Sequence, residues 1–453
     1  MKLKMFILSL LVLLCSAITL AAPIKSKQKH REPDADDTNA FPHRSVITSP
    51  YFDLSMSIYN ADDLLTRVSS MNEDLLLLQQ NQNFEKKLNK MGVSMARRRP
   101  IVGLSGKLES QILQGSSFSG ETNNDINLSY AEIDIHAIVS RWATAFMSIN
   151  YDDSSPITGN RESNSRLYLQ RGFVTIGNLN STPFYLTLGQ MYVPFGSYSS
   201  GMVTVPLTMS LARIQTRAVV LGFAHRHFYA EAYTFHGGSR LDMTNTEPLL
   251  DTYGGNIGIT DSFGFISSYK VGAGYVSNIA NSQGMQNTAL GGNTDDGGPF
   301  SGFSINGSEQ LQHKVPAADL NAKASIGPVT FIGEYISSTR RFSPVDLIFN
   351  NKGALPRALH LEIDYQPTIY GKPVLFGTAY GQTWESLALN LPKQSYSAFV
   401  SSSLIKNTVE SIEFRHDENY ASSDTAGGNN NTQPITVSGR SRNLIIGQIG
   451  LYF

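Results

Sequence analysis

The fold is decided by the last ten residues of the chain, which read Leu444-Ile445-Ile446-Gly447-Gln448-Ile449-Gly450-Leu451-Tyr452-Phe453. Side chains at alternate positions of a strand point to the same face, so Ile449, Leu451 and the terminal Phe453 share one apolar face. A final strand of this kind, ending in an aromatic residue, resembles the signal that the outer-membrane barrel assembly machinery reads. The sequence therefore predicts a transmembrane β-barrel, with these three residues as its assembly signal and that machinery as a partner.

The same period of two recurs through the preceding 350 or so residues. Leu359, Leu361 and Ile363, for example, alternate with His360, Glu362 and Asp364. The pattern predicts sixteen strands, at residues 101–113, 126–139, 141–151, 166–178, 183–191, 216–224, 227–236, 251–260, 265–276, 316–327, 328–338, 357–367, 373–384, 395–405, 408–418 and 443–453.

An even number of strands suits a bacterial outer-membrane barrel, in which short periplasmic turns alternate with longer extracellular loops. The connections predicted here alternate in that way, and the longest loop is 277–315. Pairing of the last strand with the first would leave no open edge, which a barrel in lipid requires. The fold class is therefore all-β, a 16-stranded antiparallel transmembrane β-barrel over residues 101–453, in contact with outer-membrane lipid. A soluble sandwich or barrel is the alternative.

The composition agrees with a membrane β-barrel and excludes two other classes. Of the 453 residues, only 16% are charged, whereas 10% are aromatic and 38 are glycine. The mean hydropathy of −0.16 and the single long apolar stretch, at the N-terminus, exclude a polytopic helical membrane protein. A formal net charge of −1 argues against binding to nucleic acid.

Residues 1–21 are predicted to be a cleaved signal peptide that directs export to the outer membrane. Lys2 and Lys4 precede an apolar run, and small residues follow it. Cleavage would remove Cys15, the only cysteine of the chain, so the exported protein would have no disulfide. Residues 22–60 carry mixed charges and are expected to form a disordered polar tether.

Residues 61–92 are predicted to form a short helix on the periplasmic side. Leu64, Val68, Met71, Leu75 and Leu78 follow a 4-3-4-3 spacing, which indicates a coiled-coil seam of about two heptads. Two interpretations stay open: a helix that joins copies of the chain into a homo-oligomer, and an amphipathic helix docked on another part of the same chain.

Motifs typical of enzymes are not found. The sequence has no HExxH and no GxSxG, and Gly272-Ala273-Gly274 lacks the third glycine of a phosphate-binding loop. His225 and His227 are predicted to lie in a periplasmic turn, where turn polarity explains them better than metal binding. We expect no catalytic residues, no metal site and no cofactor.

A sixteen-stranded barrel encloses a water-filled lumen. Charged side chains on its strands should face that lumen, because each would cost several kilocalories per mole on the lipid face near the midplane. The side chains assigned to the lumen are Lys107, Glu109, Glu132, Asp134, Glu362, Asp364, Glu413 and Arg415, with Arg171, Glu231, Lys270, Lys323 and Glu334.

The third extracellular loop, about 192–215, is the candidate constriction. It contains no acidic residue, and porins commonly fold such a loop into the lumen. The residues expected to contact solute are Tyr192, Phe195, Tyr198, Arg213 and Arg217. Two arginines would favour an anionic solute, whereas an ordinary surface loop remains the alternative.

Several segments together resemble one family. These are Gly103-Leu104-Ser105-Gly106-Lys107-Leu108-Glu109, Leu188-Gly189-Gln190-Met191-Tyr192-Val193-Pro194-Phe195-Gly196-Ser197-Tyr198 and Val205-Pro206-Leu207-Thr208, with the signal peptide and heptad segment. The chain from about residue 60 is similar to the siderophore porins typified by the legiobactin receptor, the LbtU family. The resemblance implies uptake of a ferric siderophore across the outer membrane.

The strand count bears on the mechanism of uptake. TonB-dependent receptors use a plugged 22-stranded barrel, and sixteen strands with about eighty N-terminal residues leave no room for such a plug. Passage would therefore be by diffusion. A general or other-solute porin remains the alternative function, and a structural or adhesive surface protein is a third.

Overall fold

The structure is a computed structural model of the 453-residue chain. The residues it describes are 46–48, 72–90, 101–152, 166–239, 241, 250–263, 266–286, 300, 302–303, 311–428, 431–434 and 439–453. The predicted signal peptide, residues 1–21, lies outside the described residues, as does most of the predicted tether at 22–60.

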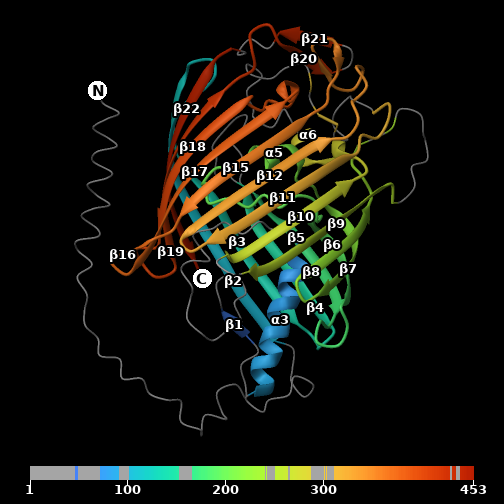
Figure 1. Ribbon diagram of the computed structural model, residues 1–453, viewed down its shortest axis with the longest axis vertical. Helices are drawn as coiled ribbons and strands as arrows, with labels where there is room; N and C mark the ends of the chain where they lie inside the picture. The colour runs from blue at the N-terminus through green and yellow to red at the C-terminus, as the bar shows by residue number, and fades with distance from the viewer. Residues whose placement is uncertain are drawn as a thin grey trace. The chain divides into compact units, whose positions relative to one another are not determined.

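Sixteen strands of the described chain close into an antiparallel barrel (Figure 1), which confirms the predicted fold class. Each strand pairs with its neighbours along the chain, and β2 also pairs with β22. Their bounds are β2 Ile101–Ser116, β3 Thr122–Ile138, β4 Ala143–Asp152, β5 Arg166–Gly177, β6 Phe184–Tyr192, β7 Gln215–His225, β8 Phe228–Phe235, β9 Thr252–Phe263, β10 Ile266–Val276, β11 Ala317–Ile326, β12 Val329–Ser338, β15 Arg357–Tyr365, β17 Lys372–Trp384, β18 Gln394–Ser402, β19 Thr408–Glu418 and β22 Ser441–Tyr452.

The barrel closes through the terminal residue. Phe453 exchanges backbone hydrogen bonds of 3.0 and 2.8 Å with Gly106 of β2. A side chain at Gly106 would collide with the Phe453 ring, so glycine is needed where the two strand ends meet. The C-terminal residue thus lies at the seam that completes the sheet.

Inner and outer faces alternate along each strand as the sequence predicts. On β15, Leu361 and Ile363 are exposed on the outside, whereas Glu362 and Asp364 are buried inside. Outward aromatic residues gather near the strand ends. Tyr335 contacts Trp384, and Phe184 contacts Phe223 near the opposite end. Such girdles are typical of the two membrane interfaces of an outer-membrane barrel.

Short connections define one end of the barrel, here called the turn end, and longer ones the opposite loop end. The turn end includes 139–142, 178–183 and 226–227, and the small hairpin strand β16, Thr368–Ile369, projects there. At the loop end, β13 Ile348–Phe349, β14 Lys352–Gly353, β20 Thr425–Gly428 and β21 Asn431–Pro434 form a separate small sheet (Figure 1). In outer-membrane barrels the short turns face the periplasm.

The connection between β2 and β3 is shorter than the sequence predicts. A loop over 114–125 was expected, but both strands continue, with Gly115 paired to Asn123 and only 117–121 left between them. The polar residues 122–125 still form ladder hydrogen bonds, because a strand beyond the lipid needs no apolar face.

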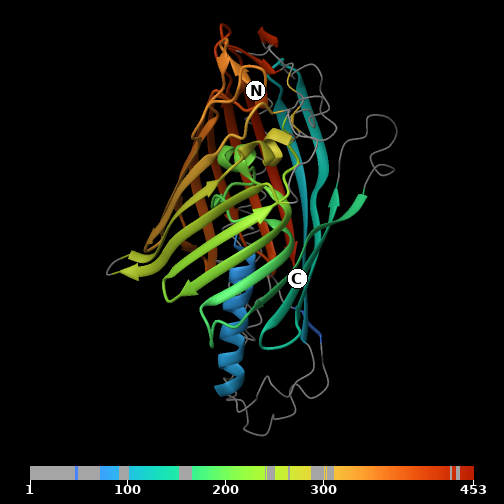
Figure 2. The ribbon, with the colours of Figure 1, turned by 90° about the vertical axis from the view of Figure 1, so that its right-hand side faces the viewer.

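The N-terminal part of the described chain adds a strand and a helix. The short strand β1, Val46–Thr48, lies within the stretch predicted to be a disordered tether. It pairs in parallel with residues 102–104 of β2. The α-helix α3, Glu73–Lys90, occupies part of the segment predicted to be helical. Figure 2 shows α3 entering the barrel from the turn end. Within the described residues, no helix is long and apolar enough to cross a membrane.

Candidate functional site

The connection between β6 and β7, residues 193–214, folds into the barrel. Val193, Phe195, Leu211 and Ile214 are fully buried. The short helix α5, Leu207–Ala212, lies within this segment and is seen inside the barrel in Figures 1 and 2. We call residues 193–214 the inward loop.

Three wall carboxylates hold the inward loop. Glu334 on β12 accepts hydrogen bonds from the backbone N–H groups of Ser197 and Tyr198, at 2.5 and 3.0 Å, and from the hydroxyl of Thr208 at 2.6 Å. Three charge-assisted hydrogen bonds to one carboxylate are strong compared with neutral ones. Glu334 therefore fixes both the start of the loop and helix α5 against a wall far from the loop's own strands in sequence.

The remaining two anchors lie further around the barrel. Glu362 on β15 accepts from the Ser200 hydroxyl and the Gly201 N–H, each at 2.6 Å. Glu413 on β19 accepts from the N–H and hydroxyl of Thr204, at 2.8 and 2.5 Å. The loop thus contacts β12, β15 and β19 in succession, and it narrows the lumen.

Two glycines allow the path of the loop. Gly196 has a φ of +84°, in the region that glycine adopts without strain, and a Cβ there would overlap the Tyr198 ring. A Cβ on Gly201 would overlap Leu375 and Phe399 of the facing wall. Glycine therefore lets the backbone come close enough to Glu362 to donate its N–H.

Of the five solute-contact residues predicted from the sequence, four lie in the lumen and one lies on the outer surface. Tyr192, Phe195 and Tyr198 are buried in the core of the lumen, and Arg213 is partly exposed there. The Arg213 guanidinium lies 4.6 Å from the Tyr192 ring centre and donates from Nε to Gln283 at 2.8 Å.

The prediction for Arg217 is wrong. Arg217 is exposed, and its neighbours Ala218 and Val220 are buried on the inner face. Because strand side chains alternate, Arg217 lies on the outer surface, together with Leu221. Arg217 was predicted to lie just inside this strand and was assigned to the solute path because it closely follows Arg213, but the alternation of β7, Gln215–His225, places it outside.

A second segment entering the lumen was missed by the sequence analysis. Residues 277–286, with the 3-10 helix η3 Ile279–Asn281 and the helix α6 Gln283–Gln286, were assigned to an extracellular loop. Ser282 donates its hydroxyl to the carbonyl of Leu211 at 2.8 Å, and the Gln283 N–H donates to that of Arg213 at 2.8 Å. The absence of charge from Val276 to Gln286 was the available signal.

The wall residues assigned to the lumen mostly have partners there. Lys107 lies 3.8 Å from Glu132 and over the Tyr130 ring. Glu132 also bonds Arg171, which lies 3.6 Å from Asp134. The Tyr452 hydroxyl donates to Glu109 at 2.8 Å. Asp364 is buried beside Glu362.

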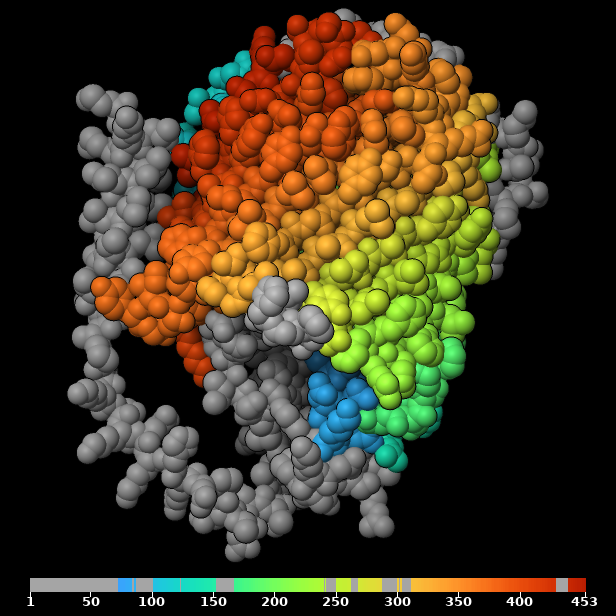
Figure 3. All heavy atoms as spheres, in the orientation of Figure 1, coloured from blue at the N-terminus to red at the C-terminus, as the bar shows by residue number. Residues whose placement is uncertain are grey.

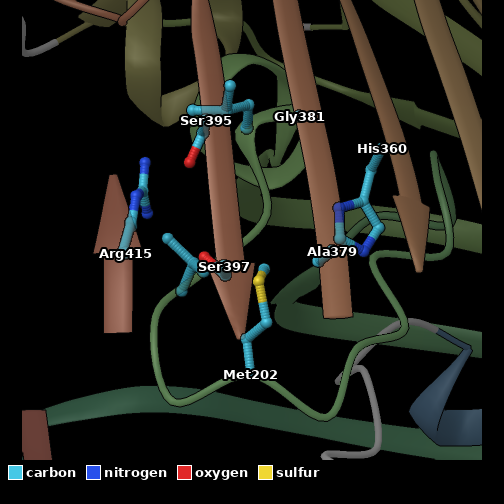
Figure 4. A pocket seen from close by; sticks show the side chains of 9 residues that line it. Met202, His360, Ala379, Gly381, Ser395, Ser397 and Arg415 are labelled. Carbon is cyan, nitrogen blue, oxygen red and sulfur yellow. The ribbon is translucent and has the colours of Figure 1, made fainter. Parts of the chain in front are cut away.

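Arg415 and Asp417 complete the charged wall near the inward loop. Asp417 accepts at 2.8 Å from the Nε atoms of both Arg415 and Arg442. Arg415 lines a pocket between the loop and β15–β19 (Figure 4), with Met202, Val205, Leu207, His360, Ala379, Gly381, Ser395 and Ser397 as the other lining residues. The polar groups of His360, Arg415, Ser395 and Ser397 thus lie opposite a mainly apolar stretch of the loop, Met202 to Leu207.

The lumen contains acids that hold the inward loop and bases that remain partly exposed. Glu334, Glu362 and Glu413 each accept hydrogen bonds from the inward loop, whereas Arg213 and Lys107 are partly exposed. Among the described residues, no group of His, Cys, Asp and Glu side chains is arranged to hold a metal ion.

A closed sixteen-stranded barrel with an inward third loop is the fold of the outer-membrane porins. The barrel is similar to the anion-selective porin from Comamonas acidovorans, with a TM-score of 0.51 over 78% of this chain and 100% of that one, at 12% identity. At this identity the similarity concerns the fold alone.

Sequence comparison identifies the particular family. The chain is 36% identical to a UPF0422 protein of Coxiella burnetii (strain RSA 493 / Nine Mile phase I) over 401 residues, 87% of this chain and 81% of the relative. It is also 36% identical to a UPF0422 protein of Legionella pneumophila (strain Paris) over 417 residues, 90% of this chain and 76% of the relative. The chain belongs to the UPF0422 family. No family model matches it.

Proposed function

We propose that this protein is a solute-selective outer-membrane channel that takes up a ferric siderophore, or a similar small anionic solute, by diffusion. The observation that carries the selectivity is the inward loop, fixed by Glu334, Glu362 and Glu413. A loop held at three points of the wall does not move aside for every solute. It supports a narrow passage with defined lining residues instead of a wide general pore.

The lining chemistry supports an anionic solute. The solute would meet Arg213 and Lys107, with Arg415 behind the loop. Of the nearby carboxylates, Glu132 is paired with Lys107, Asp417 with Arg415, and Glu413 accepts hydrogen bonds from Thr204 of the loop. A guanidinium binds carboxylate oxygens in a planar, bidentate way. Ferric siderophores built on carboxylate or catecholate chelators are anionic and present such oxygens. The resemblance of the chain to siderophore porins supports ferric siderophores as the class of solute.

The test is planar-bilayer conductance of the purified protein in a salt gradient, with and without a ferric siderophore. The proposal expects a reversal potential that favours anions and a saturable block by the siderophore. Arg213→Gln should reduce both effects. Arg217→Gln is the matched control, because Arg217 lies on the outer face and should leave both unchanged.

Diffusion of diverse solutes is the second candidate function. It would give conductance that follows solute size alone, with no saturable block by any ferric siderophore. The absence of conductance in every condition would contradict both candidates.

A further inference from the structure

Helix α3 lies inside the lumen, and its contacts run from the middle of the wall to the turn end. At its N-terminal end the Glu73 carboxylate is 2.7 Å from Arg171 on β5, and the Asn72 side-chain oxygen accepts from Asn256 on β9 at 3.2 Å. At its other end Glu85 accepts from Arg141 at 2.9 Å and from Asn180 at 2.7 Å, in two turn-end connections. Figure 3 shows atoms of α3 at this opening of the barrel.

Apolar side chains fix the helix to the wall between these polar ends. Leu75 and Leu78 belong to a buried cluster with Tyr185 and Tyr229. Leu77 is buried with wall residues that include Phe146 and Phe173. Leu76, between them in sequence, is 41% exposed. One face of α3 is therefore docked, and the opposite face remains open to the lumen.

Two leucines of the predicted heptad pack within a single chain, and not between two copies of it. Leu75 and Leu78, which the sequence placed on a coiled-coil seam, are covered here by the barrel that they belong to. A helix across the turn-end opening obstructs the passage between the inward loop and the periplasm. Because α3 does not pair with the sheet, it can leave without breaking any ladder hydrogen bond of the barrel.

We propose that α3 is an internal plug, which closes the channel from the periplasmic side and opens it by withdrawing from the lumen. This inference rests on the proposed channel function. The plug and the inward loop are separate obstructions: the loop selects the solute, and the helix sets the fraction of channels that conduct. Leu75, Leu77 and Leu78 stabilise the closed state, together with the polar contacts at both ends of the helix.

A matched pair of substitutions tests the plug. Leu77→Asp places a charge in the docked face, and we expect the ratio of conducting to closed channels to rise about tenfold or more, since tenfold corresponds to only about 1.4 kcal/mol. Leu76→Asp carries the same change on the exposed face and should leave the ratio unchanged. Heat-modifiability on gels reports whether each variant still forms a barrel.

A crosslink provides the converse test. In a chain carrying Cys15→Ser, Asn72→Cys with Asn256→Cys places two thiols where the side chains now touch. Closing them with a short, cleavable bifunctional thiol reagent should hold conductance at or below the wild-type value, even with Leu77→Asp present. Cleavage of the linker should restore the higher conductance.

The outcomes separate the two proposals. Equal conductance in Leu77→Asp, Leu76→Asp and wild type would overturn the plug while leaving the channel intact. High conductance in the fully crosslinked protein would also overturn it. If neither wild type nor any variant conducts, the proposed function itself fails, and the plug with it.

Discussion

Glu334, Glu362 and Glu413 illustrate what single residues contribute to this protein. The alternation of the strands was sufficient to place their side chains in the lumen, and that placement is observed. Their partners could not be predicted, because most of the donors are backbone N–H groups and hydroxyls of a loop with no charge pattern of its own. Arg217 was assigned to the wrong face because its closeness to Arg213 in the sequence was given more weight than the alternation of its own strand.

The outer face gives a prediction at the same scale. Leu361 is exposed towards lipid near the middle of β15, so Leu361→Arg should lower the free energy of unfolding by about 2–4 kcal/mol. Leu361→Met keeps an apolar side chain and should change it little. Denaturant unfolding in lipid vesicles measures both. Equal stability of the two variants would mean that this face does not contact hydrocarbon.

At the scale of elements, the strands were predictable and the elements inside the barrel were not. Sixteen periodic segments were enough for the barrel, because lipid outside and water inside impose alternation on every strand. Helix α3 could be expected from its leucines, but its docking site is a wall assembled from β4 to β9, which no local pattern encodes. The docked position was one of two alternatives that the leucine spacing left open.

Strand β22 carries the second prediction. Deletion of Phe453 removes both the terminal aromatic residue and its backbone hydrogen bonds to Gly106. We expect a sharp fall in the amount of folded barrel in the outer membrane, measured by heat-modifiability of membrane fractions. Phe453→Tyr keeps an aromatic ring and the backbone pairing, and it should assemble nearly normally. Normal assembly of the deletion variant would refute the role of this residue as the assembly signal.

Helix α3 carries a prediction about pH. Burial raises the pKa of Glu73 to about 7 from 4.5, although the Arg171 guanidinium opposes the shift. Glu132 on β3 and Asp74 on α3 add to the rise, and Asp134 on β3 also lies near Arg171. A carboxyl with a higher pKa in the docked state takes up a proton on docking. Docking should therefore weaken as pH rises from about 4.5 to about 7 and then level off.

The measurement for this third prediction is mean conductance as a function of pH. Conductance of the wild type should rise between about pH 5 and about pH 7. Glu73→Gln, which cannot titrate, should show a smaller rise, with the remainder due to Asp74, whose pKa burial also raises. A rise of the same size in both proteins would show that Glu73 is not the titrating group.

At the scale of the whole molecule, the barrel is a complete sheet to which the N-terminal segments are added. The contacts of α3 are side-chain contacts with the inner wall, and the ladder of the barrel is closed between β2 and β22 without it. We therefore predict that deletion of residues 22–92 leaves a heat-modifiable barrel with a higher mean conductance. Loss of the barrel would contradict the prediction that residues 101–453 form the barrel on their own.

The most direct test of the central claim, a channel narrowed by an anchored inward loop, is the single-channel conductance of wild type and Glu334→Ala in the same planar bilayer. Glu334 holds three donors of the loop, and each hydrogen bond to a charged group contributes about 1.5–3 kcal/mol. Glu418→Ala, at the exposed end of β19, is the control. The account predicts a larger and noisier open-channel conductance for Glu334→Ala, with the control equal to wild type. Identical open-channel conductance in all three proteins would contradict it.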